Sequence, residues 1–181
     1  IDSGTDSATR IYANSVALTG TFGGGDQGQF ALAVNGSNPS LDVRDNLLLD
    51  TQATGAANTS YAIGLGYASF TNLTSNFNDL FVSAGGNFSL GRTGSLAPAG
   101  GTDLATLAAW QGATGKDAAS LAADPLFVSA TDLHLTAASP ALVWRMERKR
   151  SGYCRCRSAS TSGVPSVEPS SITSSSARSS S

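Results

Sequence analysis

The chain has 181 residues, 40% of them hydrophobic, and a formal net charge of −2 at pH 7. Its length suits one domain or the last piece of a larger one, and the apolar fraction suffices for a core. Residues 1–140 carry four cations against eleven aspartates, whereas residues 141–181 carry seven cations against two glutamates. The uncharged run 51–78 is too polar to cross a bilayer, and both cysteines lie at 154 and 156. These features exclude a membrane span in that run, and they exclude a disulfide or a cysteine-ligated metal within the segment 1–140.

Short β-compatible runs separated by turn residues dominate the segment 1–90. Large and small side chains alternate in several of them, as expected for strands with unlike faces. The runs start roughly every 15 to 25 residues, and glycine or asparagine closes most of them. The predicted strands lie at 11–18, 30–34, 41–44, 47–49, 61–65, 80–82 and 88–90.

The period changes near residue 103, where one short helix is predicted over about 103–114. Leu104, Leu107 and Trp110 stand three apart, and the alanines between them favour helix. Asp103, or the threonine before it, can cap the start, and Gly115 can end the helix.

Regularly spaced strands favour a β-solenoid, in which each coil pairs its backbone with the coils above and below. Asn14, Asn46 and Asn78 then have a structural role, because asparagines tolerate left-handed corners and can stack in amide ladders. A β-sandwich with the same strand spacing is the alternative fold.

Several segments together resemble a known family. The sequences at 42–48, 60–64 and 73–81 are similar to consecutive late coils of bacterial right-handed parallel β-helix proteins of the pectate-lyase-like superfamily. The closing segment of that group resembles 107–111, 113–118, 123–128, 132–135 and 139–141. The resemblance covers about residues 8–142. It implies an all-β, right-handed parallel β-helix over 1–142, and it implies little about function, since this fold hosts both enzymes and surface proteins.

The resemblance stops after Ala141. Residues 143–181 form a serine- and arginine-rich tail that cannot bury a core, so we expect it to be disordered. Residues 152–157, read one nucleotide later, are compatible with codons for a family-like strand, which suggests a frameshifted tail that resequencing would test. Ile1-Asp2-Ser3-Gly4 has neither an initiator methionine nor a leader pattern, so we expect a fragment of a longer secreted protein that is marginally stable alone.

Sequence patterns assign no catalytic, cofactor-binding or metal-binding residue. His134, the sole histidine, alternates with leucines and is predicted to face solvent. The group Asp42, Arg44 and Asp45 could sit where a lyase of this fold binds calcium and an acidic sugar, but a solvated strand face is the favoured interpretation. Cys154 and Cys156 have the wrong spacing for a zinc knuckle. We therefore expect no cofactor; calcium is the one ion that the fold of the resembling family allows, and no residue pattern here supports it.

Three function classes follow. The favoured one is a noncatalytic, extracellular or cell-surface β-helix segment, adhesin-like or glycan-binding, whose partner is a polysaccharide or a host or cell-surface glycan. One alternative is the C-terminal part of a polysaccharide lyase or glycoside hydrolase with its catalytic coils upstream, and the other is a structural spacer. No specific nucleic-acid partner is expected, since the basic tail attracts anions only through its charge. The oligomeric state stays open.

Overall fold

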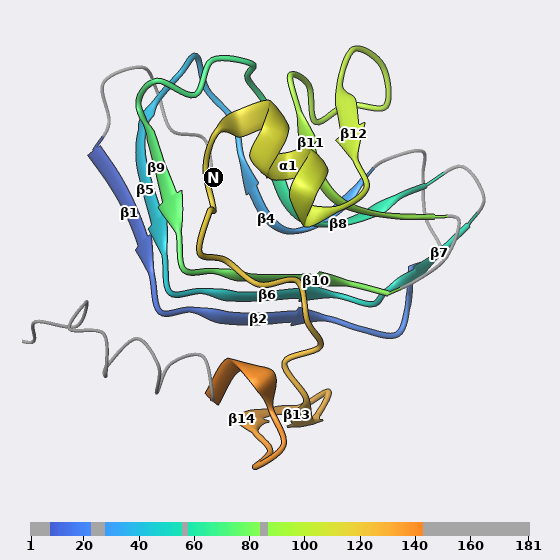
Figure 1. Ribbon diagram of the computed structural model, residues 1–181. Helices are drawn as coiled ribbons and strands as arrows, with labels where there is room; N and C mark the ends of the chain where they lie inside the picture. The colour runs from blue at the N-terminus through green and yellow to red at the C-terminus, as the bar shows by residue number, and fades with distance from the viewer. Residues whose placement is uncertain (1–7, 23–27, 56–57, 84–86, 143–181) are drawn as a thin grey trace, which may run out of the picture.

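The computed structural model describes residues 8–22, 28–55, 58–83 and 87–142, and within these ranges it is an all-β fold with one short helix and a helical turn at 140–142 (Figure 1). The predictions of disorder and of a frameshift in 143–181 lie outside the described residues. The strands and the helix are β1 (Ala8–Tyr12), β2 (Ser15–Leu18), β3 (Thr21–Phe22), β4 (Gln29–Val34), β5 (Ser40–Arg44), β6 (Leu47–Asp50), β7 (Ala53–Thr54), β8 (Ser60–Leu65), β9 (Leu73–Asn76), β10 (Asp79–Val82), β11 (Phe88–Thr93), β12 (Thr102–Leu104), α1 (Leu107–Thr114), β13 (Phe127–Ser129) and β14 (Asp132–Leu135).

Three successive stretches of chain, which we call layers 1, 2 and 3, each add one strand to the same three sheets. Layer 1 holds β1, β2 and β4, layer 2 holds β5, β6 and β8, and layer 3 holds β9, β10 and β11. Every pairing between layers is parallel, and Thr9, Leu41 and Leu73 stand in one register. The repeat is longer than predicted because each layer supplies one strand to each of three sheets, and layers 1 and 2 also hold the short parallel pair β3 and β7. Parallel pairing also counts against the alternative β-sandwich, whose sheets are antiparallel.

Each layer turns its first corner at an asparagine, as predicted. Asn14 Nδ2 donates to Asn46 Oδ1 at 2.9 Å, and Asn46 Nδ2 donates to Asn78 Oδ1 at 3.0 Å. The left-handed backbone, however, falls on the residue before each asparagine, namely Ala13, Asp45 and Phe77, with φ of 54°, 62° and 61°. The predicted run 11–18 is therefore two strands with a corner between them. The amide ladder compensates for backbone strain of about 1 kcal/mol or more at each corner.

The core lies between the three sheets and is filled from all three layers (Figure 1). The fully buried aliphatic side chains repeat at equivalent places, as at Leu48 and Leu80 on the adjacent strands β6 and β10. The equivalent side chain of layer 1, Val16, is only partly buried. Layer 1 is thus the less covered end of the core.

Helix α1 covers the other end of the core and begins later than predicted. Thr106 is its N-cap, accepting from Ala109 N, and Gly115 ends it at φ 68°, as predicted. Asp103, the predicted N-cap, instead lies in β12, which pairs antiparallel with β11. The side chain of Trp110 is fully buried, and its ring occupies the space that a Cβ on Gly91 would need, 2.4 Å away. A glycine is required on β11 for this close approach.

Residues 116–142 return along the β2-β6-β10 sheet and end in a hairpin. Leu121 pairs with Asp79 in a parallel bridge, and Leu121 N donates to Asn78 O at 2.8 Å. The strands β13 and β14 then pair antiparallel beside that sheet, and residues 140–142 are helical (Figure 1). The predicted closing segment therefore forms a small separate unit that packs against layer 1, where β14 contacts β2.

Candidate functional site

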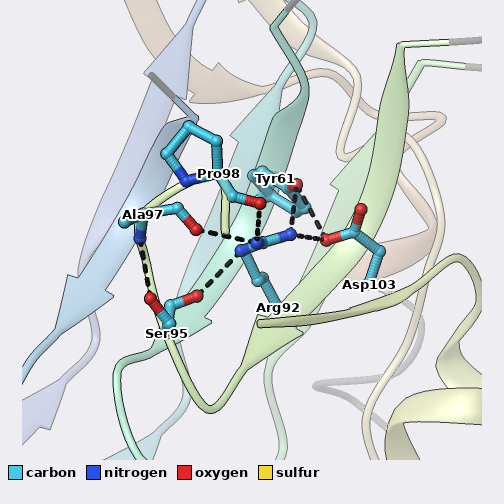
Figure 2. A network of polar contacts seen from close by, with 6 residues as sticks. All are labelled: Tyr61, Arg92, Ser95, Ala97, Pro98 and Asp103. Carbon is cyan, nitrogen blue, oxygen red and sulfur yellow. Dashed lines mark hydrogen bonds and ion pairs between the residues drawn. The ribbon is translucent and has the colours of Figure 1, made fainter. Parts of the chain in front are cut away.

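Arg92 lies at the centre of a polar network that joins the strands β8, β11 and β12 (Figure 2). Its side chain is 5% exposed, and its position on β11 sets it opposite Asp103 of β12. Nε donates to Ser95 O at 2.8 Å, and Nη2 donates to Ala97 O at 2.8 Å and to Pro98 O at 2.9 Å. Nη1 donates to Tyr61 Oη at 3.3 Å and forms an ion pair with Asp103. Since a guanidinium has five N–H donors, these contacts use all of them.

Tyr61 and Asp103 complete the network from two other strands. Tyr61, on β8, donates its hydroxyl to Asp103 Oδ1 at 2.9 Å. Burial and then the hydrogen bond to Asp103 raise the pKa of the Tyr61 hydroxyl. Asp103 is 45% exposed. The tyrosine hydroxyl therefore stays protonated near neutral pH, next to a carboxylate that water can reach.

An aromatic stack supports this network from layer 1. The rings of Phe30 and Tyr61 stack with centroids 4.7 Å apart and an interplanar angle of 10°. Phe30 also lies against Gly64, where a Cβ would come within 2.5 Å of the ring. The stack fixes the ring plane of Tyr61 and so the direction of its hydroxyl.

A hollow of about 120 Å³ opens beside the network, lined by Gly28, Thr59, Tyr61, Arg92, Leu96, Pro98 and Asp103. Sites that enclose a whole small molecule usually measure about 300–1,000 Å³. The hollow suits one unit of a longer ligand. Arg92 has no donor left for an anion, so the groups offered to a ligand are the Asp103 carboxylate and the Tyr61 hydroxyl. These groups bind neutral hydroxyls better than they bind acidic ones.

Replacing Arg92 with lysine tests its structural role. We expect the free energy of unfolding to fall by about 1–3 kcal/mol, because lysine cannot reach the three carbonyls of 95–98 and the Tyr61–Asp103 pair together. Urea denaturation measures the change. The matched control is Arg44→Lys, since Arg44 pairs with Asp42 but is 43% exposed, and there the change should stay within about 0.5 kcal/mol. Equal effects at both positions would contradict the assignment.

Two further carboxyls, Asp50 and Asp79, are buried and do not contact Arg92 or Asp103 in the network, although Asp50 accepts a hydrogen bond from the backbone of Tyr61. Each has an Oδ2 atom without a hydrogen-bond partner, and their side chains belong to the most buried in the protein. Burial raises the pKa of both carboxyls to about 6. The native state therefore holds protons that the unfolded chain releases between about pH 4 and pH 6.

From this difference we predict that stability falls as the pH rises from about 4 to 6. The double variant Asp50→Asn/Asp79→Asn should lose this dependence. Between about pH 4 and pH 6, the free energy of unfolding of the unmodified protein should therefore fall relative to that of the variant, by a few kcal/mol at most. Thermal unfolding between pH 3.5 and pH 7.5 measures it. A difference between the two proteins that is independent of pH would refute the prediction.

The residues singled out from the sequence do not form one site, although Asp45 and His134 both line a hollow of about 350 Å³ beside Asn14. The His134 side chain is 90% exposed, as predicted, and contacts Asp132 two residues away on β14. Asp42 and Arg44 form an ion pair on β5, and Tyr12 from β1 donates to Asp42. Within the described ranges, no three histidine, cysteine, aspartate or glutamate side chains are placed to hold a metal ion. The cysteines lie outside these ranges.

The Tyr61–Arg92–Asp103 network was not found from the sequence. The sequence patterns place Tyr61 in a predicted strand, count Arg92 only among the cations, and predict Asp103 as a helix cap. One signal was present: Arg92 is one of only four cations in residues 1–140 and comes two residues after the run 88–90. A cation within a β-run of a cation-poor chain is a candidate for a buried ion pair.

Comparisons with protein-family models, with curated proteins and with solved structures find no match to this chain. A membrane-spanning helix needs about 20 apolar residues, and no helix of the described residues has the length and apolar character to cross a bilayer. The site must therefore be interpreted from its own geometry.

Proposed function

We propose that this chain is a noncatalytic segment of a bacterial surface or secreted protein, built as a right-handed parallel β-helix, that binds a glycan at the Tyr61–Asp103 hollow. The observation that carries the proposal is that one charged group of the network binds only within the protein, while the other can also contact a ligand. Arg92 uses all its donors within the protein, while Asp103 stays 45% exposed beside a tyrosine hydroxyl. A carboxylate accepts hydrogen bonds from two neighbouring sugar hydroxyls without any change in its protonation.

The β-helix is supported by the parallel register and by the asparagine ladder. Three sheets receive one strand from each of three layers, and the side-chain amides of Asn14, Asn46 and Asn78 are hydrogen-bonded in sequence. A stack of this kind presents long, flat strand faces on which a polymer can lie across several layers. The small size of the hollow favours one sugar unit of such a polymer over a free small molecule.

The extracellular location is proposed from the composition. The segment 1–140 has no cysteine, no glutamate and one lysine, with many asparagines, threonines and glycines. We propose that the binding requires neither metal nor cofactor. Addition of EDTA should then leave the affinity unchanged.

Glycan-array binding of the full chain, together with lyase assays on pectin, alginate and chondroitin, tests the function. We expect binding to at least one neutral glycan without turnover. Asp103→Ala should weaken it at least about tenfold, because it removes the exposed acceptor of a charge-assisted hydrogen bond. The matched control is Asp132→Ala, since Asp132 is also 45% exposed but lies on β14. Turnover of any polysaccharide would favour the lyase, and silence in both assays would favour a structural spacer.

A further inference from the structure

The asparagine ladder has two unlike ends. Each asparagine donates both its backbone N–H and its side-chain amide to the Oδ1 atom of the asparagine in the next layer: Asn14 N to Asn46 at 3.1 Å, and Asn46 N to Asn78 at 3.1 Å. Each Oδ1 is therefore the acceptor for the layer before it. This arrangement gives the ladder a direction.

The end of the ladder at layer 3 is closed by residues outside the repeat. Asn78 N donates to Ser120 Oγ at 2.9 Å, and Asn78 Nδ2 donates to Asp117 Oδ1 at 3.0 Å. Ser120 Oγ in turn donates to Asp117 Oδ1 at 2.6 Å, and Trp110 Nε1 donates to Asp117 Oδ2 at 2.9 Å. Together a carboxylate and a hydroxyl substitute for the missing asparagine, so no donor of Asn78 is left over.

The end at layer 1 is not closed in the same way. Asn14 is exposed, and within the described ranges its Oδ1 atom accepts no hydrogen bond. Its amide donors, by contrast, are used, since Nδ2 donates to Tyr12 O and to Asn46 Oδ1. What this end lacks is the pair of donors that another asparagine would supply.

The backbone of the neighbouring strand β2 also has hydrogen-bond partners on one side only, the side of layer 2. In each case the donor lies one layer after its acceptor: Leu47 N donates to Asn14 O at 2.8 Å, and Asp79 N donates to Asn46 O at 2.8 Å. Ser15 is the register partner of Leu47, so its N–H points away from β6, toward the open edge. In the described residues β2 pairs with β6 alone. The closing strand β14 contacts β2 but does not pair with it, so among the described residues this edge keeps unpaired N–H groups and is a template for strand addition.

Apolar side chains are also left partly uncovered at this end. Ile11 and Val16 of layer 1 are half-buried, whereas their register partners in layer 2, Val43 and Leu48, are 0% and 1% exposed. Another layer placed on layer 1 would cover them just as layer 1 covers layer 2.

From these three observations we propose that the layer 1 face is an interaction surface for one further layer of the same type. Its occupant is a polypeptide segment whose strands pair parallel with β1 and β2 and whose asparagine donates to Asn14 Oδ1. The contact continues the interface between layers 1 and 2, so its hydrogen bonds and its register are already defined. An antiparallel second copy could pair with the edge but could not supply those two donors to Asn14.

The chain itself contains a suitable probe. The segment 40–71 spans one full repeat, so a second copy inserted between residues 7 and 8 keeps every downstream register. In the lengthened chain, the added Asn46 stands over Asn14. We expect hydrogen exchange of the Ser15 and Ala17 amides to slow by about tenfold or more, and the midpoint of thermal unfolding to rise by several degrees. The matched control carries Asn46→Ala in the inserted copy alone, which should remove most of the rise.

Unchanged exchange at Ser15 and Ala17 in the insertion variant would overturn the proposal. If that variant does not fold, a synthetic peptide of residues 40–54 is added to the unmodified full chain. Slower exchange at the same two amides, lost with an Asn46→Ala peptide, supports the proposal, and unchanged exchange rejects it. Protection in the unmodified chain that rises with protein concentration, together with a dimer by gel filtration, would make a second copy the occupant and would also overturn it.

Discussion

Trp110→Ala should lower the free energy of unfolding by about 3–5 kcal/mol, the largest effect that we expect from a single substitution in this protein. The Trp110 side chain is fully buried, lies against Gly91 of β11, and donates from Nε1 to Asp117 Oδ2. Alanine would leave a cavity at the covered end of the core. It would also leave the Asp117 carboxylate, which closes the asparagine ladder, with one hydrogen bond fewer.

Urea denaturation followed by circular dichroism measures this change without relying on the tryptophan signal. Trp110→Phe separates the two causes, since it keeps most of the ring volume and removes only the Nε1 donor; we expect a loss of about 1–2 kcal/mol. The control is Val128→Ala, because Val128 is 56% exposed, and it should change stability by less than about 0.5 kcal/mol. A Trp110→Ala loss as small as that of Val128→Ala would show that α1 does not cover the core.

Asn46→Ala should have the second largest effect, a loss of about 2–4 kcal/mol. Asn46 is fully buried in the middle of the ladder, accepts from Asn14 N and Nδ2, and donates to Ile11 O, Arg44 O and Asn78 Oδ1. Alanine would leave several buried polar groups without partners at once, and each such group costs about 1–3 kcal/mol before water enters. Because the amides polarise one another, the loss should exceed that of a single hydrogen bond.

Asn72→Ala is the matched control for Asn46→Ala. Asn72 is exposed and donates once, to Asn38 O at 3.2 Å, so its removal should cost less than about 0.5 kcal/mol. Asn14→Ala, at the open end, should fall between the two. Thermal and urea unfolding of the three variants give the order, and equal losses in all three would contradict a ladder that holds the layers together.

Most of the strands could be predicted from the sequence because their signals are local. The alternation at 30–34, 41–44 and 61–65 leads to β4, β5 and β8, with bounds that differ by one residue or less. The corner asparagines could also be predicted, since they recur at a regular spacing along the chain. The break that this corner makes within the run 11–18 could not be predicted, because Ala13 and Asn14 do not interrupt the β-compatible pattern.

The start of the helix was misplaced because a tertiary contact overrides the local pattern. Asp103 is a good N-cap by residue type, but it pairs with Arg92 as β12 adds to the edge of β11. Thr106 then becomes the cap. Helix propensity is a weak preference, and a buried guanidinium that needs a counter-charge outweighs it.

The sequence by itself determined the all-β class, the corner asparagines, the end of the helix at Gly115 and the exposure of His134. These features depend on near neighbours along the chain or on a repeat that can be counted. Only the tertiary structure decided that Tyr61, Arg92 and Asp103 meet and that Asp117 and Ser120 close the ladder. Those contacts join residues as many as 42 apart, and their partners depend on the stacking of layers in register, which no local pattern specifies.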